Sequence, residues 1–161
     1  MGTEILCAEG ALTVRRFREG DLPAFAALLA DPEVMRWLEP PFDRARAAEF
    51  LRTAGLSEPP LIYAAEEDGA FLGYVIFHRY GGEDAAELGW VLRRSAWGRG
   101  YAGRLTALLL SAAEGKWAEA VIECAPEQRA SARVAERLGF REEGMADGCR
   151  VFRRTVPRDG T

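Results

Sequence analysis

The spacing of hydrophobic residues changes character near residue 60 of the chain. Before that point, aspartates stand directly ahead of three apolar segments, which is the position of a helix N-cap. Pro40-Pro41 and Gly55 then supply the stop signals that end helices. This half predicts a strand over 12–17 followed by helices over 22–30, 32–38 and 44–54.

After residue 60, apolar and polar residues alternate with a period of two, which is typical of strands. Tight turns are expected at Asp68-Gly69, Gly81-Gly82 and Asp147-Gly148. The predicted strands are 61–66, 71–80, 85–92, 120–124, 140–145 and 149–156, with helices over 101–113 and 127–138. An antiparallel meander that gains a parallel β-α-β crossover is a mixed α+β architecture, here with about seven strands in one sheet flanked by helices.

The composition favours one ordinary globular domain over 1–161, because 161 residues with 48% hydrophobic and 29% charged side chains can bury a core of their own. The net charge of -4 argues against nucleic acid as a partner, and no apolar run has the length of a membrane span. Three cysteines and one histidine form no believable zinc set, so no metal is expected. Reduced structural thiols and the absence of a secretory pattern predict a cytoplasmic protein.

The densest motif is the glycine segment that follows the strand over 85–92. Gly98, Gly100 and Gly103 match G-x-G-x-x-G, and Glu123 follows about 20 residues later, as in a dinucleotide-binding fingerprint. However, a separate loop divides the strand from the first glycine, and a long antiparallel region precedes it. After Glu123 the chain also has too few β-α units for a doubly wound sheet, so a nicotinamide oxidoreductase is the weaker alternative.

A glycine turn that enters a helix N-terminus can nevertheless hold a pyrophosphate. Its free backbone N–H groups and the positive end of the helix dipole both favour an anion. Arg94, Arg99 and Arg104 add positive charge around this turn. The competing interpretation is a loop that only reverses the chain direction.

At this point the chain resembles the GNAT superfamily of N-acetyltransferases, in particular the branch of ribosomal-protein N-terminal acetyltransferases. Several segments carry the resemblance, and their order is more specific than any one of them. They are Glu87-Leu88-Gly89-Trp90-Val91-Leu92, Trp97-Gly98-Arg99-Gly100-Tyr101-Ala102, Gln128-Arg129-Ala130-Ser131, Arg137-Leu138-Gly139-Phe140, Arg16 to Leu22 and Asp31 to Met35. Ser95 and Gln128 depart from the family pattern, and Ala135 stands where relatives often carry a tyrosine that protonates the thiolate.

The resemblance implies acetyl-CoA as co-substrate and places the backbone oxyanion donor near Leu92. The residues expected to bind acetyl-CoA are Val91, Leu92, Arg93, Trp97, Gly98, Arg99, Gly100, Tyr101, Ala102, Gln128 and Ser131. The resemblance further implies that Trp37 lies in the segment that covers the acceptor.

Acetyl transfer to an amine needs a group that removes a proton and a donor for the thiolate. Glu87, an acid in an apolar strand beside the glycine loop, and Glu123 on the next strand are the candidate bases, with Glu87 preferred. Ser131 is the candidate thiol partner, whereas His78 is interpreted as a histidine at the end of a hairpin.

The sequence therefore predicts an N-acetyltransferase that moves an acetyl group from acetyl-CoA to a primary amine by direct attack in a ternary complex. The amine is a protein N-terminus or a small molecule. A non-catalytic acyl-CoA sensor on the same fold is the other alternative, and the sequence leaves monomer and homodimer equally open.

Overall fold

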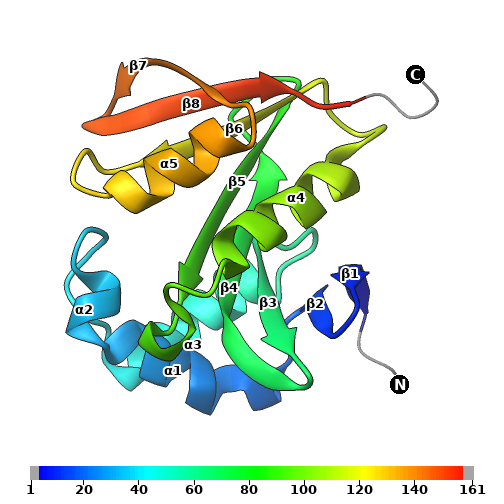
Figure 1. The fold of residues 1–161 in the computed structure, drawn as a ribbon. Helices are drawn as coiled ribbons and strands as arrows, with labels where there is room; N and C mark the ends of the chain where they lie inside the picture. The colour runs from blue at the N-terminus through cyan, green and yellow to red at the C-terminus, as the bar shows by residue number, and fades with distance from the viewer. Residues whose placement is uncertain (1–3, 158–161) are drawn as a thin grey trace. The chain divides into compact units, whose positions relative to one another are not determined.

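The computed structural model describes residues 4–157, whose strands and helices are labelled in Figure 1. The strands are β1 (Ile5–Glu9), β2 (Leu12–Arg15), β3 (Ile62–Glu67), β4 (Ala70–Arg79), β5 (Ala85–Leu92), β6 (Glu119–Cys124), β7 (Arg141–Ala146) and β8 (Cys149–Thr155). The α-helices are α1 (Leu22–Ala30), α2 (Pro32–Met35), α3 (Arg44–Phe50), α4 (Tyr101–Ala113) and α5 (Arg129–Arg137).

The strands form one mixed sheet of eight in the order β1-β2-β3-β4-β5-β6-β8-β7. Its pairs β1/β2, β2/β3, β3/β4, β6/β8 and β7/β8 are antiparallel, and β5/β6 is parallel. This confirms the mixed, mostly antiparallel architecture with a β-α-β crossover through α4. The expected number of about seven strands was one too low, because β1 was missed. Its mostly exposed residues give no clear alternation.

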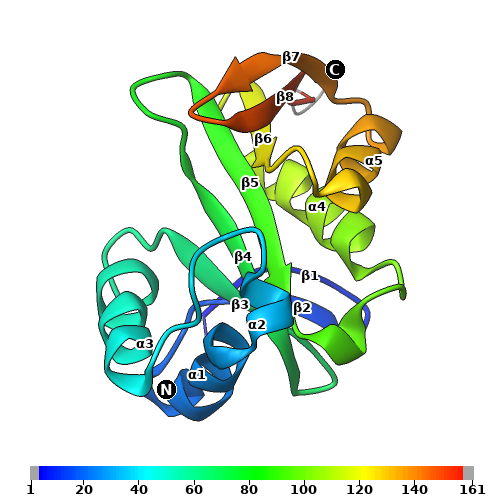
Figure 2. The ribbon, with the colours of Figure 1, turned by 90° about the vertical axis from the view of Figure 1, so that its left-hand side faces the viewer.

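The chain forms two compact units, one made of 1–76 with 90–99 and the other of 77–89 with 100–161. In the first unit, α1 packs against α2 and α3 (Figure 2). Phe25 is fully buried, with ring centroids 4.9 Å from Phe17, 5.7 Å from Phe50 and 5.7 Å from Tyr74. Edge-to-face and offset contacts of this kind fix the aromatic core of the unit.

The helices of the first unit start where the sequence predicted. Asp31 accepts a hydrogen bond from the Glu33 N–H and Asp43 one from the Arg46 N–H, so each caps the helix that follows it. Asp21 does not cap α1 with its side chain. Its carboxylate instead takes two hydrogen bonds of 2.9 Å from Arg15, and both residues are buried.

In the second unit, α5 packs against α4 and against β6, β7 and β8 (Figure 1). Strand alternation separates the two faces of this part of the sheet. Ile122 and its β8 partner Phe152 are fully buried on the helix side, where Arg154 donates to the Leu138 carbonyl at the end of α5. Glu123 and its β8 partner Val151 lie on the opposite face.

Candidate active site

The two candidate carboxylates lie on the same face of the parallel pair β5/β6. Glu87 is in register with Val121, and Glu123 lies two residues beyond Val121, so alternation points both side chains to one side of the sheet. This face is opposite to the one covered by α5. The structure of the second unit therefore brings together the two acids that the sequence proposed, although they are about 36 residues apart in the chain.

Glu87 has an environment that disfavours its charged form. The side chain is 24% exposed, and its burial raises the pKa of the carboxyl above the ordinary value. The positive charge that His78 carries when protonated opposes this rise in pKa, and the negative charge of Glu123 adds to it. A carboxyl with a raised pKa is better matched to proton transfer near neutral pH than an ordinary one.

His78, near the end of β4, and Tyr80, the first residue after β4, contact these acids. Tyr80 donates a hydrogen bond of 2.6 Å from its hydroxyl to Glu123 Oε1, and this bond raises the pKa of Tyr80 to about 12. His78 Nε2 lies 3.8 Å from Glu87 Oε1. Sequence reasoning missed both contacts. The available signal was the hairpin across Gly81-Gly82, since the Tyr80 N–H donates to the Ala85 carbonyl and this register sets His78 opposite Glu87.

The segment expected to bind acetyl-CoA begins in the first unit, at the C-terminal end of β5, where the backbone is hydrogen-bonded to β4. The Arg93 N–H donates to the Leu72 carbonyl at 2.8 Å. Because hydrogen-bonding edges alternate along a strand, the N–H and C=O of Leu92 point away from β4. The Trp97 indole donates to that Leu92 carbonyl at 2.8 Å. Val91 is buried in the core of the unit, so its side chain serves packing.

The two glycines of the segment adopt the backbone conformation that the motif requires. Gly98 has φ +73° and Gly100 has φ +79°, and a Cβ at either position would meet open space. Glycine is therefore needed here for its left-handed backbone and leaves room for a ligand, whereas no internal packing demands it. Arg99, between them, is exposed.

In the second unit, Gly100 is the N-cap of α4, the longest helix of the described chain. Tyr101 is buried and Ala102 is half-buried at its first positions. The Arg104 N–H is bonded to the Gly100 carbonyl, so the N-terminal end of the helix lies just ahead of this bond. That end can hold a phosphate by backbone groups alone.

Other expected residues have structural partners. Arg94 donates to Asp31 Oδ2 at 2.7 Å, so its charge is not free for an anion. The Gln128 side chain accepts a bond from the Ala125 N–H at 2.8 Å and closes the turn that leads into α5. Ser131 lies half-buried in the first turn of that helix. Trp37, just after α2, is 41% exposed and lies under the Arg36 guanidinium.

Sequence reasoning also missed Gly73 in the middle of β4. Its φ is +152°, and a Cβ there would overlap the Val91 carbonyl and lie 2.8 Å from the Leu92 Cα. Residue 73 thus allows the close approach of β4 to the backbone of the proposed oxyanion residue. An isolated glycine inside a strand pattern was the available signal.

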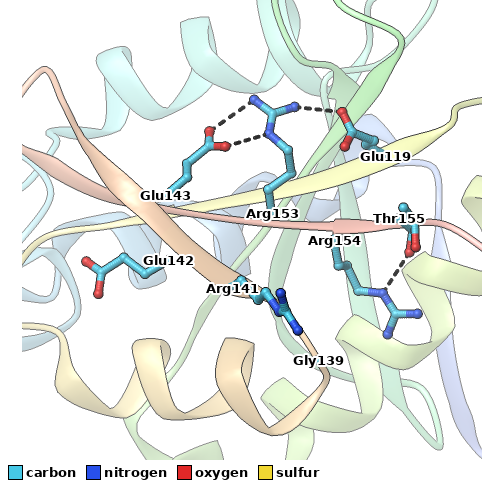
Figure 3. Close-up of a pocket in the computed structure, with 8 residues that line it drawn as sticks. All are labelled: Glu119, Gly139, Arg141, Glu142, Glu143, Arg153, Arg154 and Thr155. Atoms are coloured by element: carbon cyan, nitrogen blue, oxygen red, sulfur yellow. Dashed lines mark hydrogen bonds and ion pairs between the residues drawn. The ribbon is translucent and has the colours of Figure 1, made fainter.

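A pocket in the second unit lies at β7, β8 and the start of β6 (Figure 3). Its central Arg153 is paired with Glu143, Glu83 and Glu119 at 3.0 to 3.2 Å. Arg154 donates to the carbonyls of Thr155 and Leu138. Because the charge of Arg153 is balanced by carboxylates and Arg154 is bonded to backbone, we interpret this pocket as structural.

Among the described residues 4–157, no helix has the length and apolar character needed to span a bilayer. Within the same residues, no group of three or more His, Cys, Asp or Glu side chains is placed to hold a metal ion.

Comparison with known proteins agrees with this architecture. Residues 11–141 match the family model described as an acetyltransferase (GNAT) domain, and the chain belongs to this family. It is 27% identical over 142 residues to the uncharacterized N-acetyltransferase YnaD of Bacillus subtilis, covering 86% of this chain and 84% of that one. The chain is accordingly an acetyl-CoA-dependent acyltransferase.

Solved structures share the fold. An acetyltransferase of the GNAT family from Bacillus anthracis has a TM-score of 0.83 at 24% identity, over 93% of this chain and 98% of that one. RimL, a ribosomal L7/L12 alpha-N-protein acetyltransferase solved in complex with coenzyme A, has a TM-score of 0.82 at 22% identity, over 97% and 100%. The alternative of a dinucleotide oxidoreductase is overturned, since the family and the mostly antiparallel sheet exclude a doubly wound fold.

Proposed function

We propose that this protein transfers the acetyl group of acetyl-CoA to a primary amine by direct attack in a ternary complex, in the cytoplasm. The observation that carries the proposal is the pair Glu87 and Glu123 on one face of β5/β6, with the pKa of Glu87 raised by burial. Family membership supplies the acetyl donor, and this pair supplies a place for the proton of the amine.

The amine must lose its proton before it attacks the thioester. A lysine-like amine is over three pH units from neutrality at pH 7, whereas an α-amine is about one unit away. Glu87 is the proposed base, acting directly or through water, and Glu123 is its negatively charged neighbour. A peptide N-terminus would demand less of Glu87 than a lysine side chain would.

The remaining steps are assigned to backbone groups and one hydroxyl. The Leu92 N–H, which points away from β4, is the proposed donor to the oxyanion of the tetrahedral intermediate. The N-terminal end of α4 at Gly100 to Ala102 is the proposed pyrophosphate site, continuing the segment from Arg93 to Arg99. Ser131 is the proposed hydrogen-bond partner of the departing thiolate, and exposed Trp37 is a proposed contact of the acceptor.

The acceptor class that we favour is a protein N-terminal α-amine. RimL, which shares the fold, is named for acetylation of this kind, and the low pKa of an α-amine suits a site with one base. Small-molecule amines are the competing acceptors.

The test combines ligand binding with thiol release. Acetyl-CoA and CoA should raise Tm, whereas NAD and NADP should not. Free thiol should then appear with a peptide that carries a free N-terminal serine. The same peptide with an acetylated N-terminus and one internal lysine is the matched control. Thiol release with spermidine but not with the free N-terminus would indicate that the acceptor is a small-molecule amine. Binding of acetyl-CoA without thiol release from any amine would contradict the enzyme assignment.

The preference for Glu87 is tested with Glu87→Gln and Glu123→Gln. Loss of a general base typically lowers the rate about 10²- to 10⁴-fold, so Glu87→Gln should show this loss and no acid limb in its kcat/KM profile. If Glu123→Gln collapses while Glu87→Gln keeps its activity, the two roles are to be exchanged.

A further inference from the structure

The single histidine of the chain lies directly beside the proposed base. His78 is on β4, opposite Glu87 in the hairpin register, and its Nε2 is 3.8 Å from Glu87 Oε1. This distance is longer than a hydrogen bond, but catalytic contacts are often long in the absence of ligands and shorten when the site is filled. The two side chains are 27% and 24% exposed, so neither is freely solvated.

The other ring nitrogen of His78 fixes which atom faces Glu87. Nδ1 lies 2.7 Å from the Arg79 carbonyl oxygen. A carbonyl can only accept, so Nδ1 carries the proton of this bond. In the neutral ring, the lone pair is then on Nε2, the nitrogen that faces the carboxyl of Glu87.

From this geometry we infer that His78 is a positioning residue of the transfer reaction, whose Nε2 accepts from Glu87 the proton taken from the amine and passes it to solvent. The inference rests on the proposed function, because it assumes that Glu87 is the base. It gives His78 a role in the reaction, whereas the sequence pattern favoured a structural histidine at the end of a hairpin.

The reaction releases a proton, which needs a route from Glu87 to solvent. Acetylation of R–NH3⁺ by acetyl-CoA forms the amide and CoA–SH and releases one proton. The Glu87 carboxylate takes that proton from the ammonium, and the N–H bond breaks as the O–H bond forms. Glu87 then gives it to Nε2, and the imidazolium loses it to water. Both side chains return to their starting state, and no other reactant is consumed.

The charges around Glu87 give the electrostatic test a definite sign. The groups that face it are His78 from β4, Tyr80 just after β4, Glu123 from β6 and Cys149 from β8. The pKa of Cys149 is raised by burial and then by acids that include Glu123 and Glu87. Protonated His78 lowers the pKa of Glu87, and Glu123 raises it. Loss of His78 should therefore raise the pKa of Glu87, and loss of the Glu123 charge should lower it.

The first experiment measures the titration of Glu87 by carboxyl NMR in the full chain, without any acceptor. His78→Asn is the informative variant, because its amide can still donate to the Arg79 carbonyl while the base at Nε2 is gone. We expect the Glu87 titration to move to higher pH in His78→Asn and to lower pH in Glu123→Gln. An unchanged titration in His78→Asn would overturn the coupling.

The second experiment measures kcat/KM against pH with acetyl-CoA and the peptide carrying a free N-terminal serine. His78→Asn should lower kcat at least about tenfold and leave the KM for acetyl-CoA unchanged. Added imidazole should restore the rate of His78→Ala in a concentration-dependent way, and it should not restore Glu87→Gln.

The outcomes separate this inference from the proposed function. Full activity of His78→Asn, or the absence of imidazole rescue in a folded His78→Ala, would contradict the role of His78. The proposed acetyltransferase function would still stand. If the wild-type protein acetylates no amine, the proposed function is contradicted, and so is the role of His78 that rests on it.

Discussion

Single residues in this chain differ in whether their conformation serves folding or ligand binding, and the glycines of the acyl-CoA segment show the difference. Gly100 has φ +79°, a left-handed backbone that favours glycine, and no atom lies close to where its Cβ would be. The fold therefore needs glycine at this position for its backbone conformation and not for close packing. Gly103, on the first turn of α4, also meets open space but has an ordinary helical backbone.

These two glycines should respond differently to alanine. Gly100→Ala forces a left-handed alanine, at about 1–2 kcal/mol, and puts a methyl group where the pyrophosphate is proposed to approach. We expect the Kd for acetyl-CoA, measured by titration calorimetry, to rise at least about tenfold. Gly103→Ala is the control, and it should stabilise the helix by about 0.5–1 kcal/mol while leaving the Kd nearly unchanged. An unchanged Kd in Gly100→Ala would contradict the backbone site.

The buried ion pair between Arg15 and Asp21 carries a pH dependence of stability. Burial by itself raises the pKa of Asp21, but hydrogen bonds from Arg15 and the Arg18 N–H and the charge of Arg15 outweigh it, so the pKa is lowered. A group with a lowered folded pKa contributes stability that is complete above its unfolded pKa of 3.8 and is lost as pH falls through the folded value.

Asp21→Asn tests this pair. Removing one partner leaves buried Arg15 without its bidentate acceptor, which should cost about 3–5 kcal/mol of the free energy of unfolding at pH 7. The difference from wild type should shrink as pH falls well below 4, and urea unfolding at several pH values measures it. The matched control is Glu58→Gln, which breaks the exposed bidentate pair with Arg16 and should cost far less, because solvent screens exposed charges. Equal losses in the two variants would contradict the argument.

At the scale of elements, β4 determines the shape of the strand that leads into the acyl-CoA segment. Gly73 lies opposite the Val91 and Leu92 backbone, and the β3/β4 register shifts beside it, because Leu72 of β4 is an extra residue between the pairs Ala65–Gly73 and Glu66–Phe71. Because Gly73 has no side chain, β4 and β5 can approach each other closely at this point. The position of the Leu92 N–H therefore depends on a residue in another strand.

Gly73→Ala should disturb this approach. Its methyl group would overlap backbone atoms, which cannot rotate away as a side chain can. We expect a loss of about 1–3 kcal/mol in the free energy of unfolding and a fall in kcat larger than any change in the Kd for acetyl-CoA. Gly20→Ala is the control, since a Cβ there meets open space and the backbone is not left-handed. Wild-type kcat in Gly73→Ala would show that the Leu92 backbone has another support.

At the scale of the whole molecule, the two compact units share strands. Residues 70–76 of β4 belong to one unit and 77–79 to the other, and β5 is divided between residues 89 and 90. Neither unit can unfold completely without breaking strands that continue into the other. We therefore propose that residues 1–161 behave as a single domain.

Calorimetry tests this proposal. A single transition is expected, with a calorimetric enthalpy equal to the van't Hoff value and on the order of 110 kcal/mol for a chain of this length. Acetyl-CoA should move the entire transition to higher temperature. Two separable transitions, of which only one responds to acetyl-CoA, would contradict a single cooperative domain.

Local patterns in the sequence were sufficient for most of the fold. The bounds of β5 and α4 match the expectation, since alternation and helical periodicity are properties of adjacent residues. Aspartate caps and Asp-Gly turns were equally readable, because they act within a few residues. The exposed edge strand β1 was missed, because few of its side chains are buried and it leaves no hydrophobic pattern.

The candidate site was predictable as a set of residue types but not as an arrangement. The sequence by itself determined the family, the glycine segment and the two acids, because motifs preserve order and spacing along the chain. Only the tertiary structure decided that Arg94 pairs with Asp31, that Tyr80 binds Glu123 and that His78 faces Glu87. These partners are set by strand register and helix packing, which join residues far apart in the chain, and no local pattern encodes such distances.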